Sequence, residues 1–486
     1  MRQVKTSRSL TWSGFAAALL AVALPLMAGA APADIDDADI ASAVETDLLI
    51  SREVPSHRVN VAVQDGIVTL TGSIDTILGR DRAVEIAQAV KGVRSVVNRL
   101  KVEPVDRTDV EIRSDIVAAL AVDPSTESYE LDVAVQDGTV TLSGTVESYK
   151  ERELCATVTK GVKGVREIDN EIKVRYESDR TDGEIKAEIE RLLANDVRID
   201  AYLVDVAVKD GDVTLSGTVG SATERTLAQS TAWVAGVKNV DTDDLTVEWW
   251  ARDRMQRKAV TENRLDADIE QAVEDAMAVD PRVWSFEVGV DSSYGTVTLT
   301  GEVGNLRAKQ AAAQDARNTI GVWRVKNHIK VRPVDPITDS EIVEDVEAAL
   351  TRDPYVDRYE TTVSARNGKV YLYGNVDSAF EKRRASEVAW GVTGVIDVEN
   401  NMNVGDTWPW KSDWKIAEDI RDQIYWNPYL YTGDITVRVR DGVATLTGEA
   451  PSWYARSQAE QSALDAGAKS VRNQIHVENG PPAYMY

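Results

Sequence analysis

Few residues in this chain have the type and spacing that catalysis or metal binding requires. The three histidines, His57, His328 and His476, lie far apart in the sequence. A catalytic triad or a metal site built on them would need partners from distant segments. Cys155 is the only cysteine, so the chain cannot form an internal disulfide. We expect Cys155 to be a small core residue of a helix, with a reactive thiol as the alternative.

The carboxylates are numerous, but their positions favour structural roles. The chain has 80 acidic and 55 basic residues and a formal net charge of −25. Acids such as Asp109, Glu111, Asp182 and Glu184 fall at predicted helix starts, where the helix dipole favours negative charge. No calcium-loop pattern is present, and nothing selects a glycosidase-like pair. The negative field repels phosphates, so we expect no nucleic-acid partner. The sequence therefore indicates a protein that is not an enzyme and needs no cofactor or metal.

A glycine-bounded stretch of the type GIVTLTG recurs six times. Its first glycine follows a turn residue and its last glycine ends a predicted strand, whereas a phosphate loop needs its glycines between a strand and a helix. We therefore expect structural roles in hairpins for these glycines. The pairs are Gly66 and Gly72, Gly138 and Gly144, Gly211 and Gly217, Gly295 and Gly301, Gly368 and Gly374, and Gly442 and Gly448.

The spacing of this stretch indicates a tandem repeat. The closing glycines are 72, 73, 84, 73 and 74 residues apart, and a Gly-Val pair follows each by 19 or 20 residues, weakened to Gly467-Ala468 in the last copy. An asparagine follows six residues later, except in the third copy, which has Asp243-Asp244 there. We predict modules at residues 34–104, 108–176, 180–248, 265–332, 338–404 and 412–478, with a linker at 249–264.

Each module reads as helix, hairpin, helix and strand. The first helix carries apolar residues four apart, such as Ile112, Ile116 and Leu120, which form one buried stripe. Turns of the Asp-Gly or Asn-Gly type join two strands with alternating apolar residues. A Thr, Ser or Asn four residues past the closing glycine is a good N-cap for a second helix. We predict an α+β chain of six αββαβ modules, each a three-stranded mixed sheet with two helices on one face.

The repeated asparagine is predicted to lie at the start of the third strand. A local backbone hydrogen bond at a bend is the favoured role, and a ligand contact is the alternative.

The N-terminus has the features of a secretory signal. Arg2, Lys5 and Arg8 precede an apolar run, and Ala28-Gly29-Ala30 fits a cleavage site. We therefore expect a cleaved signal peptide at 1–30 and a periplasmic location; an uncleaved anchor is the alternative.

The acidic-x-x-Ile helices, the G-x-V-x-L-x-G hairpin and the later Gly-Val and Asn resemble the BON domain over roughly residues 34–478. The family includes osmotically inducible periplasmic proteins, nodulation-related proteins and secretin-associated regions. The resemblance implies an αββαβ fold, an envelope location under osmotic or other stress, and binding to phospholipid membranes. It implies no catalytic residues. Six copies are unusual, since most familiar members have one to three.

The tryptophans between modules are the remaining candidates for a binding surface. Trp249, Trp250, Trp408 and Trp410 lie in predicted linkers, where no single module needs them for its core. Packing between modules is the favoured role, and an interfacial anchor or a sugar-stacking surface is the alternative. Arg252, Arg254, Arg257 and Lys258 make the 249–264 linker locally cationic, so it could attract anionic lipid. Two functions follow: a phospholipid-binding repeat array, or a scaffold for periplasmic protein or peptidoglycan partners.

Overall fold

A computed structural model describes residues 35–51, 53–54, 56–126, 130–176, 180–252, 264–283, 286–333, 337–356, 361–405 and 411–477. Residues Ile35–Tyr486 form one compact unit. The predicted signal peptide at 1–30 lies outside the described residues.

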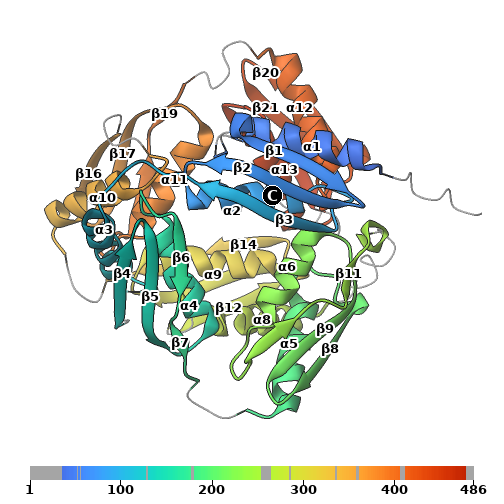
Figure 1. The fold of residues 1–486 in the computed structure, drawn as a ribbon, viewed down its shortest axis with the longest axis horizontal. Coiled ribbons are helices and arrows are strands. Elements are labelled where there is room, and N and C mark those ends of the chain that lie inside the picture. Colours follow the sequence, from blue (N-terminus) through green and yellow to red (C-terminus); the bar gives the residue numbers. More distant parts are fainter. Residues whose placement is uncertain are drawn as a thin grey trace, which may run out of the picture. The chain divides into compact units, whose positions relative to one another are not determined.

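Six modules with the same order of elements follow one another in the chain (Figure 1). Module 1 comprises α1 Asp37–Ile50, β1 Val59–Gln64, β2 Ile67–Ile74, α2 Ile77–Gln88 and β3 Ser95–Val102. Module 2 comprises α3 Asp109–Val122, β4 Leu131–Gln136, β5 Thr139–Val146, α4 Tyr149–Lys160, β6 Glu167–Asn170 and β7 Lys173–Val174. Module 3 comprises α5 Asp182–Asn195, β8 Val204–Lys209, β9 Asp212–Val219, α6 Ala222–Thr231, β10 Asn239–Asp241 and β11 Leu245–Val247.

The second half of the chain repeats this order. Module 4 comprises α8 Asp266–Ala278, β12 Val288–Ser293, β13 Thr296–Val303, α9 Leu306–Asn318, β14 Arg324–Asn327 and β15 Lys330–Val331. Module 5 comprises α10 Asp339–Arg352, β16 Thr361–Arg366, β17 Lys369–Val376, α11 Ala379–Trp390, β18 Asp397–Asn400 and β19 Asn403–Val404. Module 6 comprises α12 Asp413–Trp426, β20 Ile435–Arg440, β21 Val443–Ala450, α13 Trp453–Asp465 and β22 Ser470–Val477. Short 3-10 helices lie at Ser56–Arg58, Ala201–Leu203, Trp249–Arg252 (η3) and Thr432–Asp434.

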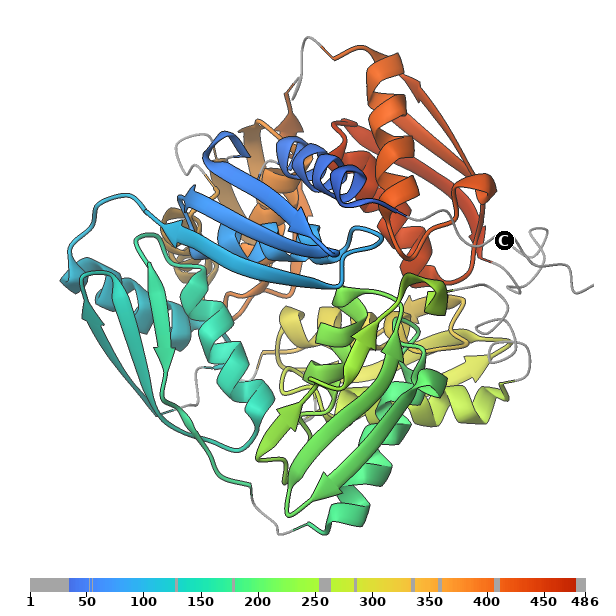
Figure 2. The same ribbon diagram turned by 45° about the vertical axis from the view of Figure 1, so that its right-hand side comes forward.

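Each module forms one mixed sheet with its middle strand in the centre. In module 1, β1 pairs antiparallel with β2, and β3 pairs parallel with β2 on its other edge. In modules 2 to 5 the third strand is divided into two short pieces, and both pair with the middle strand. The two helices lie on one face of the sheet (Figure 2). The predicted α+β architecture of six αββαβ modules is confirmed.

The local signals in the sequence also predicted where the elements begin. The N-cap side chain of each second helix accepts the backbone N–H three residues later, as Ser148 does from Glu151. Thr108, Thr181 and Thr338 form complete capping boxes. In the hairpin turns both central residues have positive φ, 52° at Asp65 and 72° at Gly66. Module 4 has no Asp-Gly or Asn-Gly pair, yet Tyr294 and Gly295 adopt the same conformation in its predicted hairpin.

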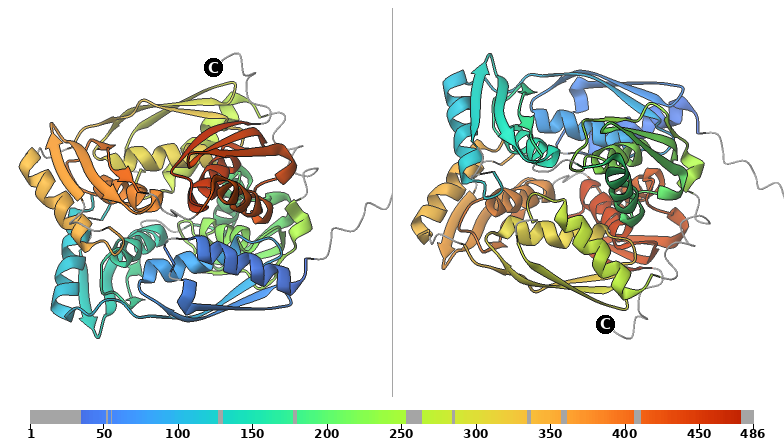
Figure 3. Two further views of the ribbon diagram at one scale, coloured as in Figure 1. Left: turned by 90° about the horizontal axis from the view of Figure 1, so that it is seen from above. Right: turned by 90° about the horizontal axis from the view of Figure 1, so that it is seen from below.

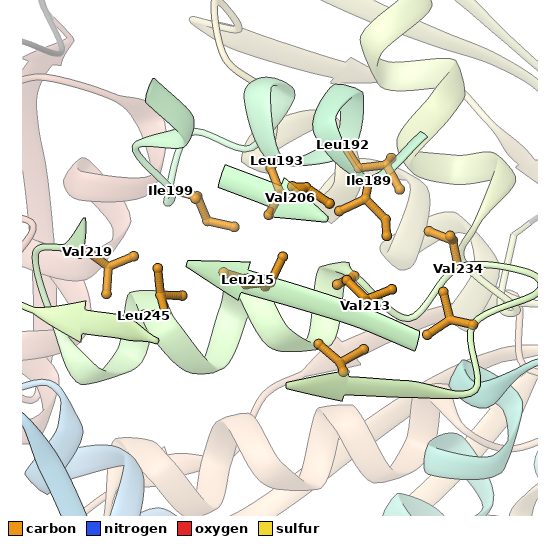
Figure 4. Close-up of a cluster of buried hydrophobic side chains, with 14 of the residues drawn as sticks. Ile189, Leu192, Leu193, Ile199, Val206, Val213, Leu215, Val219, Val234 and Leu245 are labelled. Atoms are coloured by element: carbon orange, nitrogen blue, oxygen red, sulfur yellow. The ribbon is translucent and has the colours of Figure 1, made fainter. Parts of the chain in front are cut away.

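The apolar side chains of each module form a core between its sheet and its helices. In module 3, Ile189 and Leu193 of α5 face Val213 and Leu215 of β9 (Figure 4). A single module of this size can bury only a modest apolar area, so its stability is marginal. The cores therefore gain from residues that neighbouring modules contribute.

One helical position provides such contacts within the first half of the chain. The first residue of the second helix in module 1, Ile77, lies in the core of module 2. Its counterpart in module 2, Tyr149, stacks on Trp233 of module 3 with ring centroids 3.9 Å apart. The counterpart in module 3, Ala222, lies in the core of module 1. The contacts thus run from module 1 to 2, from 2 to 3 and from 3 back to 1.

A second kind of contact pairs modules of the two halves. The backbone N–H just before the Gly-Val glycine donates to the last carbonyl of a first helix in another module, an acceptor that the helix itself leaves unsatisfied. The bonds run from Lys91 to Trp426, from Lys163 to Arg352, from Thr393 to Val122 and from Ile320 to Asn195, at 3.0, 2.9, 3.2 and 2.8 Å. Module 1 therefore contacts module 6, module 2 contacts 5, and module 3 contacts 4; Figure 3 lets these pairs be followed by colour. The chain is folded back on itself, because modules far apart in the sequence are in contact.

Two glycines of module 3 give opposite predictions for the same substitution. A Cβ at Gly217, where φ is 113°, would lie 2.1 Å from the carbonyl oxygen of Leu203, so Gly217→Ala should destabilise the module by about 2 kcal/mol. Gly183, in α5, has no atom within 4 Å of an added Cβ, so Gly183→Ala should stabilise the module by about 0.5 kcal/mol. Hydrogen exchange of module 3 peptides in the full chain measures both. Equal effects of the two variants would contradict the structure.

Candidate functional site

An aspartate in the first turn of each module's first helix binds the hairpin turn of the same module. In module 1, the carboxylate of Asp37 accepts the backbone N–H groups of Asp65 and Gly66, both at 2.8 Å. The other five modules repeat these two bonds at 2.8 to 3.0 Å. Their aspartates are Asp109, Asp182, Asp266, Asp339 and Asp413, and the turn residues follow each by 28 and 29 positions.

In two modules these bonds favour the ionised form of the carboxylate. The N–H of Gly295 and the hydroxyl of Ser292 hold the pKa of Asp266 below its usual range. The N–H groups of Gly368 and Asn367 do the same to the pKa of Asp339. A general acid at neutral pH needs a raised pKa instead. Asp266 and Asp339 are therefore suited to holding the turn and unsuited to donating protons.

The repeated asparagine connects the third strand to the second helix. In module 2, Asn170 Oδ1 accepts the N–H of Ile172 at 3.3 Å, and Asn170 Nδ2 donates to the carbonyl oxygen of Arg152 at 3.1 Å. The Arg152 guanidinium donates back to the carbonyl oxygen of Asn170 at 2.7 Å. Asn473 and Arg456 of module 6 exchange the same bonds. The predicted local backbone hydrogen bond is confirmed.

The predicted place of this asparagine at the start of the third strand is wrong. Asn170, Asn327 and Asn400 end the first piece of that strand, and Asn98 and Asn473 lie within it. The reason is that the third strand begins three residues after the glycine of the Gly-Val pair, at Ser95 in module 1 and at Glu167 in module 2, so the asparagine is its fourth residue.

In module 3 Asp241 takes the same role. Its Oδ1 accepts the N–H of Asp243 at 2.9 Å, so Asp243 and Asp244 belong to the bend that follows.

A cavity of about 840 Å³ lies between modules 2 and 3. Arg152, Arg180 and Lys238 line it together with the stacked rings of Tyr149 and Trp233. Each of the three cations donates a hydrogen bond to a backbone carbonyl oxygen, those of Asn170, Ala235 and Asp210 in the same order. The three cations of this cavity therefore already make hydrogen bonds within their own modules.

Cys155 is fully buried in the core of module 2, as predicted. Burial and the nearby Glu151 raise the pKa of its thiol to about 12, so the thiolate needed for reactivity is scarce at neutral pH. Among the described residues, no group of three or more His, Cys, Asp and Glu side chains could hold a metal ion.

The structure describes two of the four candidate tryptophans. Trp249 and Trp250 lie on η3, with 37% and 46% of their surface exposed. Trp408 and Trp410 lie outside the described residues.

Arg252, predicted to add positive charge to the linker surface, is only 8% exposed. Its guanidinium lies 4.0 Å from the ring centroid of Tyr429 in module 6 and 3.8 Å from the carboxylate of Glu224 in module 3. This residue therefore does not belong to an exposed cationic surface. Arg254, Arg257 and Lys258 lie outside the described residues.

In the described part of the chain, no helix combines the length and the apolar composition needed to cross a bilayer.

The family model described as "BON domain" matches the chain six times, at residues 36–104, 108–176, 181–248, 265–333, 338–406 and 412–479. The chain belongs to the BON-domain family. Each match contains one helix–hairpin–helix–strand module, so the aspartate and asparagine contacts are features of BON modules in this chain.

Three curated proteins are similar to parts of this BON-domain chain. Osmotically-inducible protein Y of Escherichia coli is 30% identical over 148 residues, which are 29% of this chain and 74% of that protein. Outer membrane lipoprotein DolP of Haemophilus influenzae is 30% identical over 135 residues, 27% of this chain and 69% of that protein. An uncharacterised protein of Anaplasma centrale is 28% identical over 152 residues, 29% of this chain and 97% of that protein.

A solved structure of CdsD, a structural protein of the type III secretion system of Chlamydia trachomatis, is 15% identical. It covers 43% of this chain and 91% of that chain with a TM-score of 0.13, which is too low to carry an argument.

Sequence reasoning recognised the acidic residue of the first helix but not its partner. The acidic-x-x-Ile pattern is visible in all six BON modules and an Asp-Gly or Asn-Gly turn in five of them, but neither pattern alone shows that helix and turn are in contact. The constant separation of 28 and 29 residues between aspartate and turn was the signal that connects them.

Replacing Asp266 tests the contact between helix and turn. The carboxylate of Asp266 has two oxygens that accept one backbone N–H each, whereas an amide has only one such oxygen. Asp266→Asn should therefore leave the N–H of Gly295 without its acceptor and destabilise this turn by about 1 kcal/mol. Hydrogen exchange of the module 4 hairpin measures the change. Asp268→Asn, an exposed neighbour in the same helical turn, is the matched control and should leave exchange unchanged.

The same contact predicts a pH dependence. Because the pKa of Asp266 is lowered in the folded module, its contribution is complete above the ordinary Asp pKa of about 3.9. It is lost as the pH falls through the lower folded value. Protection of the Gly295 amide in the wild type should therefore fall in acid toward that of Asp266→Asn, and identical acid profiles in both proteins would contradict this.

Proposed function

We propose that this BON-domain chain is a non-enzymatic envelope protein that binds phospholipid membranes through Trp249 and Trp250. The observation that carries the proposal is the way η3 holds these two side chains. The repeated polar residues of the modules make contacts within the modules, whereas the two tryptophans belong to a segment that occurs only once.

The short helix η3 is fixed on one side and exposed on the other. Ala251 and Arg252 are buried, and Arg252 lies over the ring of Tyr429. The carbonyl oxygen of Arg252 also accepts the hydroxyl of Tyr431 at 2.9 Å. Trp249 and Trp250 precede this fixed end and remain partly exposed. Indole rings prefer the membrane–water interface, and a fixed backbone reduces the entropy lost when they insert.

The charge of the chain requires such a contact to be local. A formal net charge of −25 repels anionic head groups at long range. Arg252 does not offset this at the surface, because it is buried against Glu224 and Tyr429. Apolar insertion of aromatic rings is attenuated less by a negative field than electrostatic adhesion is. This supports a small aromatic anchor over a broad charged face.

The names of two relatives support an envelope role. One is an osmotically inducible protein and another is an outer membrane lipoprotein. We therefore infer a periplasmic protein that supports envelope integrity under osmotic or other stress. The alternative is a scaffold with protein or peptidoglycan partners, to which a repeat array would present a long surface. The contacts between modules 1 and 6 and between modules 2 and 5 favour a folded-back chain instead.

Vesicle flotation tests the proposal. The wild-type protein should float with mixed vesicles of phosphatidylethanolamine and phosphatidylglycerol. The double variant W249A/W250A should lose most of the floated fraction, because it loses the exposed indole rings. The effect should persist at high salt, since the contact is apolar.

Trp414→Ala provides the matched control. Trp414 is 68% exposed in α12 of module 6, so its loss removes a more exposed indole at another place. Flotation should be unchanged in this variant. Equal losses in both variants, or no binding of the wild type to any bacterial lipid mixture, would contradict the proposal. Capture of a peptidoglycan or protein partner that depends on Trp249 and Trp250 without lipid binding would favour the scaffold.

A further inference from the structure

The contacts between modules divide the chain into two halves, modules 1–3 and modules 4–6. Figure 3 shows them in blue to green and in yellow-green to red. The contacts of modules 1–3 return from module 3 to module 1, and the second half closes in the same way. Leu306 of α9 in module 4 lies in the core of module 5. Arg383 of α11 in module 5 donates to Gln461 Oε1 of α13 in module 6 at 2.6 Å, and α13 contacts α9. Each half is therefore a closed ring of three modules.

One apolar position at the end of the first helix crosses from one half into the other. It is the last residue of α3 and of α12, and the C-cap residue of α8. Val122 of module 2 packs against the core of module 5, and Val279 of module 4 packs against the core of module 3. Trp426 of module 6 packs against the core of module 1. These are the same pairs of modules that the backbone hydrogen bonds join.

A second set of contacts joins the modules in different pairs across the halves. The hydroxyl of Tyr355, which follows α10 of module 5, is hydrogen-bonded to Thr76 Oγ1 of module 1 at 3.0 Å. It also donates to the carbonyl oxygen of Glu53 in module 1 at 3.3 Å. Arg307 of α9 in module 4 lies 3.0 Å from the carboxylate of Asp123, the buried C-cap residue of α3 in module 2. Modules 3 and 6 meet through Arg252, as described above. Each module of the first half therefore contacts two modules of the second half.

The halves are joined covalently at one place, between η3 and α8. The opposite half holds both ends of this connection. Arg252 lies over the ring of Tyr429 in module 6, and Arg264, just before α8, donates from Nη1 to Asn195 Oδ1 of module 3 at 2.7 Å. Residues 253–263 lie outside the described residues. The contacts that place one half on the other are thus made by the modules and by the two ends of the connection.

We propose that each half is a complete docking surface for the other, so that modules 1–3 bind modules 4–6 of a second copy of this chain as well as their own. Apolar side chains that enter a packed core, together with directed hydrogen bonds, are features of a specific interface. The covalent connection raises the effective concentration of the two halves, which favours pairing within one chain in dilute solution. Pairing between two chains gives a domain-swapped dimer with the same contacts.

Cleavage of the connection in the full chain tests whether the halves need it. A protease recognition sequence is inserted after Lys258, between the two held ends. After cleavage under native conditions, the two fragments should stay together in size-exclusion chromatography at micromolar concentration, at the elution volume of the uncut protein.

Exchange between copies is tested with isotope-labelled protein. Labelled and unlabelled cleaved proteins are unfolded in urea, mixed and refolded together. Native mass spectrometry should then show complexes of one labelled and one unlabelled half. The uncut chain, refolded at high concentration, should contain dimers that cleavage converts into complexes with the mass of one cut chain.

Val122→Asp tests the interface itself. It places a charge against the core of module 5, so it should raise the dissociation constant of the cleaved halves by about tenfold or more. Ala121→Asp adds the same charge at an exposed neighbouring position of α3 and should leave the constant unchanged. Arg307→Ala removes the partner of Asp123 without altering an apolar core and should weaken association in the same direction.

Separation of the halves on cleavage would overturn the proposal, and so would the absence of mixed complexes after joint refolding. Equal dissociation constants for Val122→Asp and Ala121→Asp, with both variants folded by circular dichroism and Arg307→Ala unchanged from the wild type, would also overturn it. None of these measurements contains lipid, so their failure leaves the proposed membrane contact untouched.

Discussion

The carboxylate that joins the first helix to the hairpin turn is the contact on which each module depends. The aspartate and the turn are separated by 28 residues in the sequence, and this contact fixes the turn against the helix start. The turn needs positive φ at two successive residues, a conformation that is strained for Asp65. Two backbone N–H groups held by one carboxylate stabilise it. Because the middle strand starts at this turn, its position then sets the register of the whole sheet.

The module itself could be predicted because its signals are local and repeated. Thr108 and Ser148 begin helices through their own side chains, and Asp65-Gly66 forms its turn from two adjacent residues. Six copies made each pattern visible above the background. The exact place of Asn170 was not predictable in the same way. Its amide bonds both a neighbour and a helix, and the helix partner is 18 residues away.

The contacts between modules could not be predicted, because the positions that make them recur but the sequence does not show which module each one meets. The bond from Thr393 to the carbonyl oxygen of Val122 joins residues 271 positions apart, and it uses backbone atoms that any sequence provides. Likewise, Trp249 could be recognised as unusual, but its exposure depends on how Arg252 meets module 6. From the sequence, Arg252 was expected to add positive charge to the linker surface. In the structure it packs between Tyr429 of module 6 and Glu224 of module 3.

A repeat protein of this kind separates its residues into two groups. Positions that recur in all modules, such as the aspartate at Asp37 and the asparagine at Asn170, are explained by contacts within a module. A function specific to this chain is then to be sought at residues that occur once. Among the described residues, the exposed pair Trp249 and Trp250 is such a candidate. It directly precedes Arg252, which packs against module 6, so it lies where modules meet.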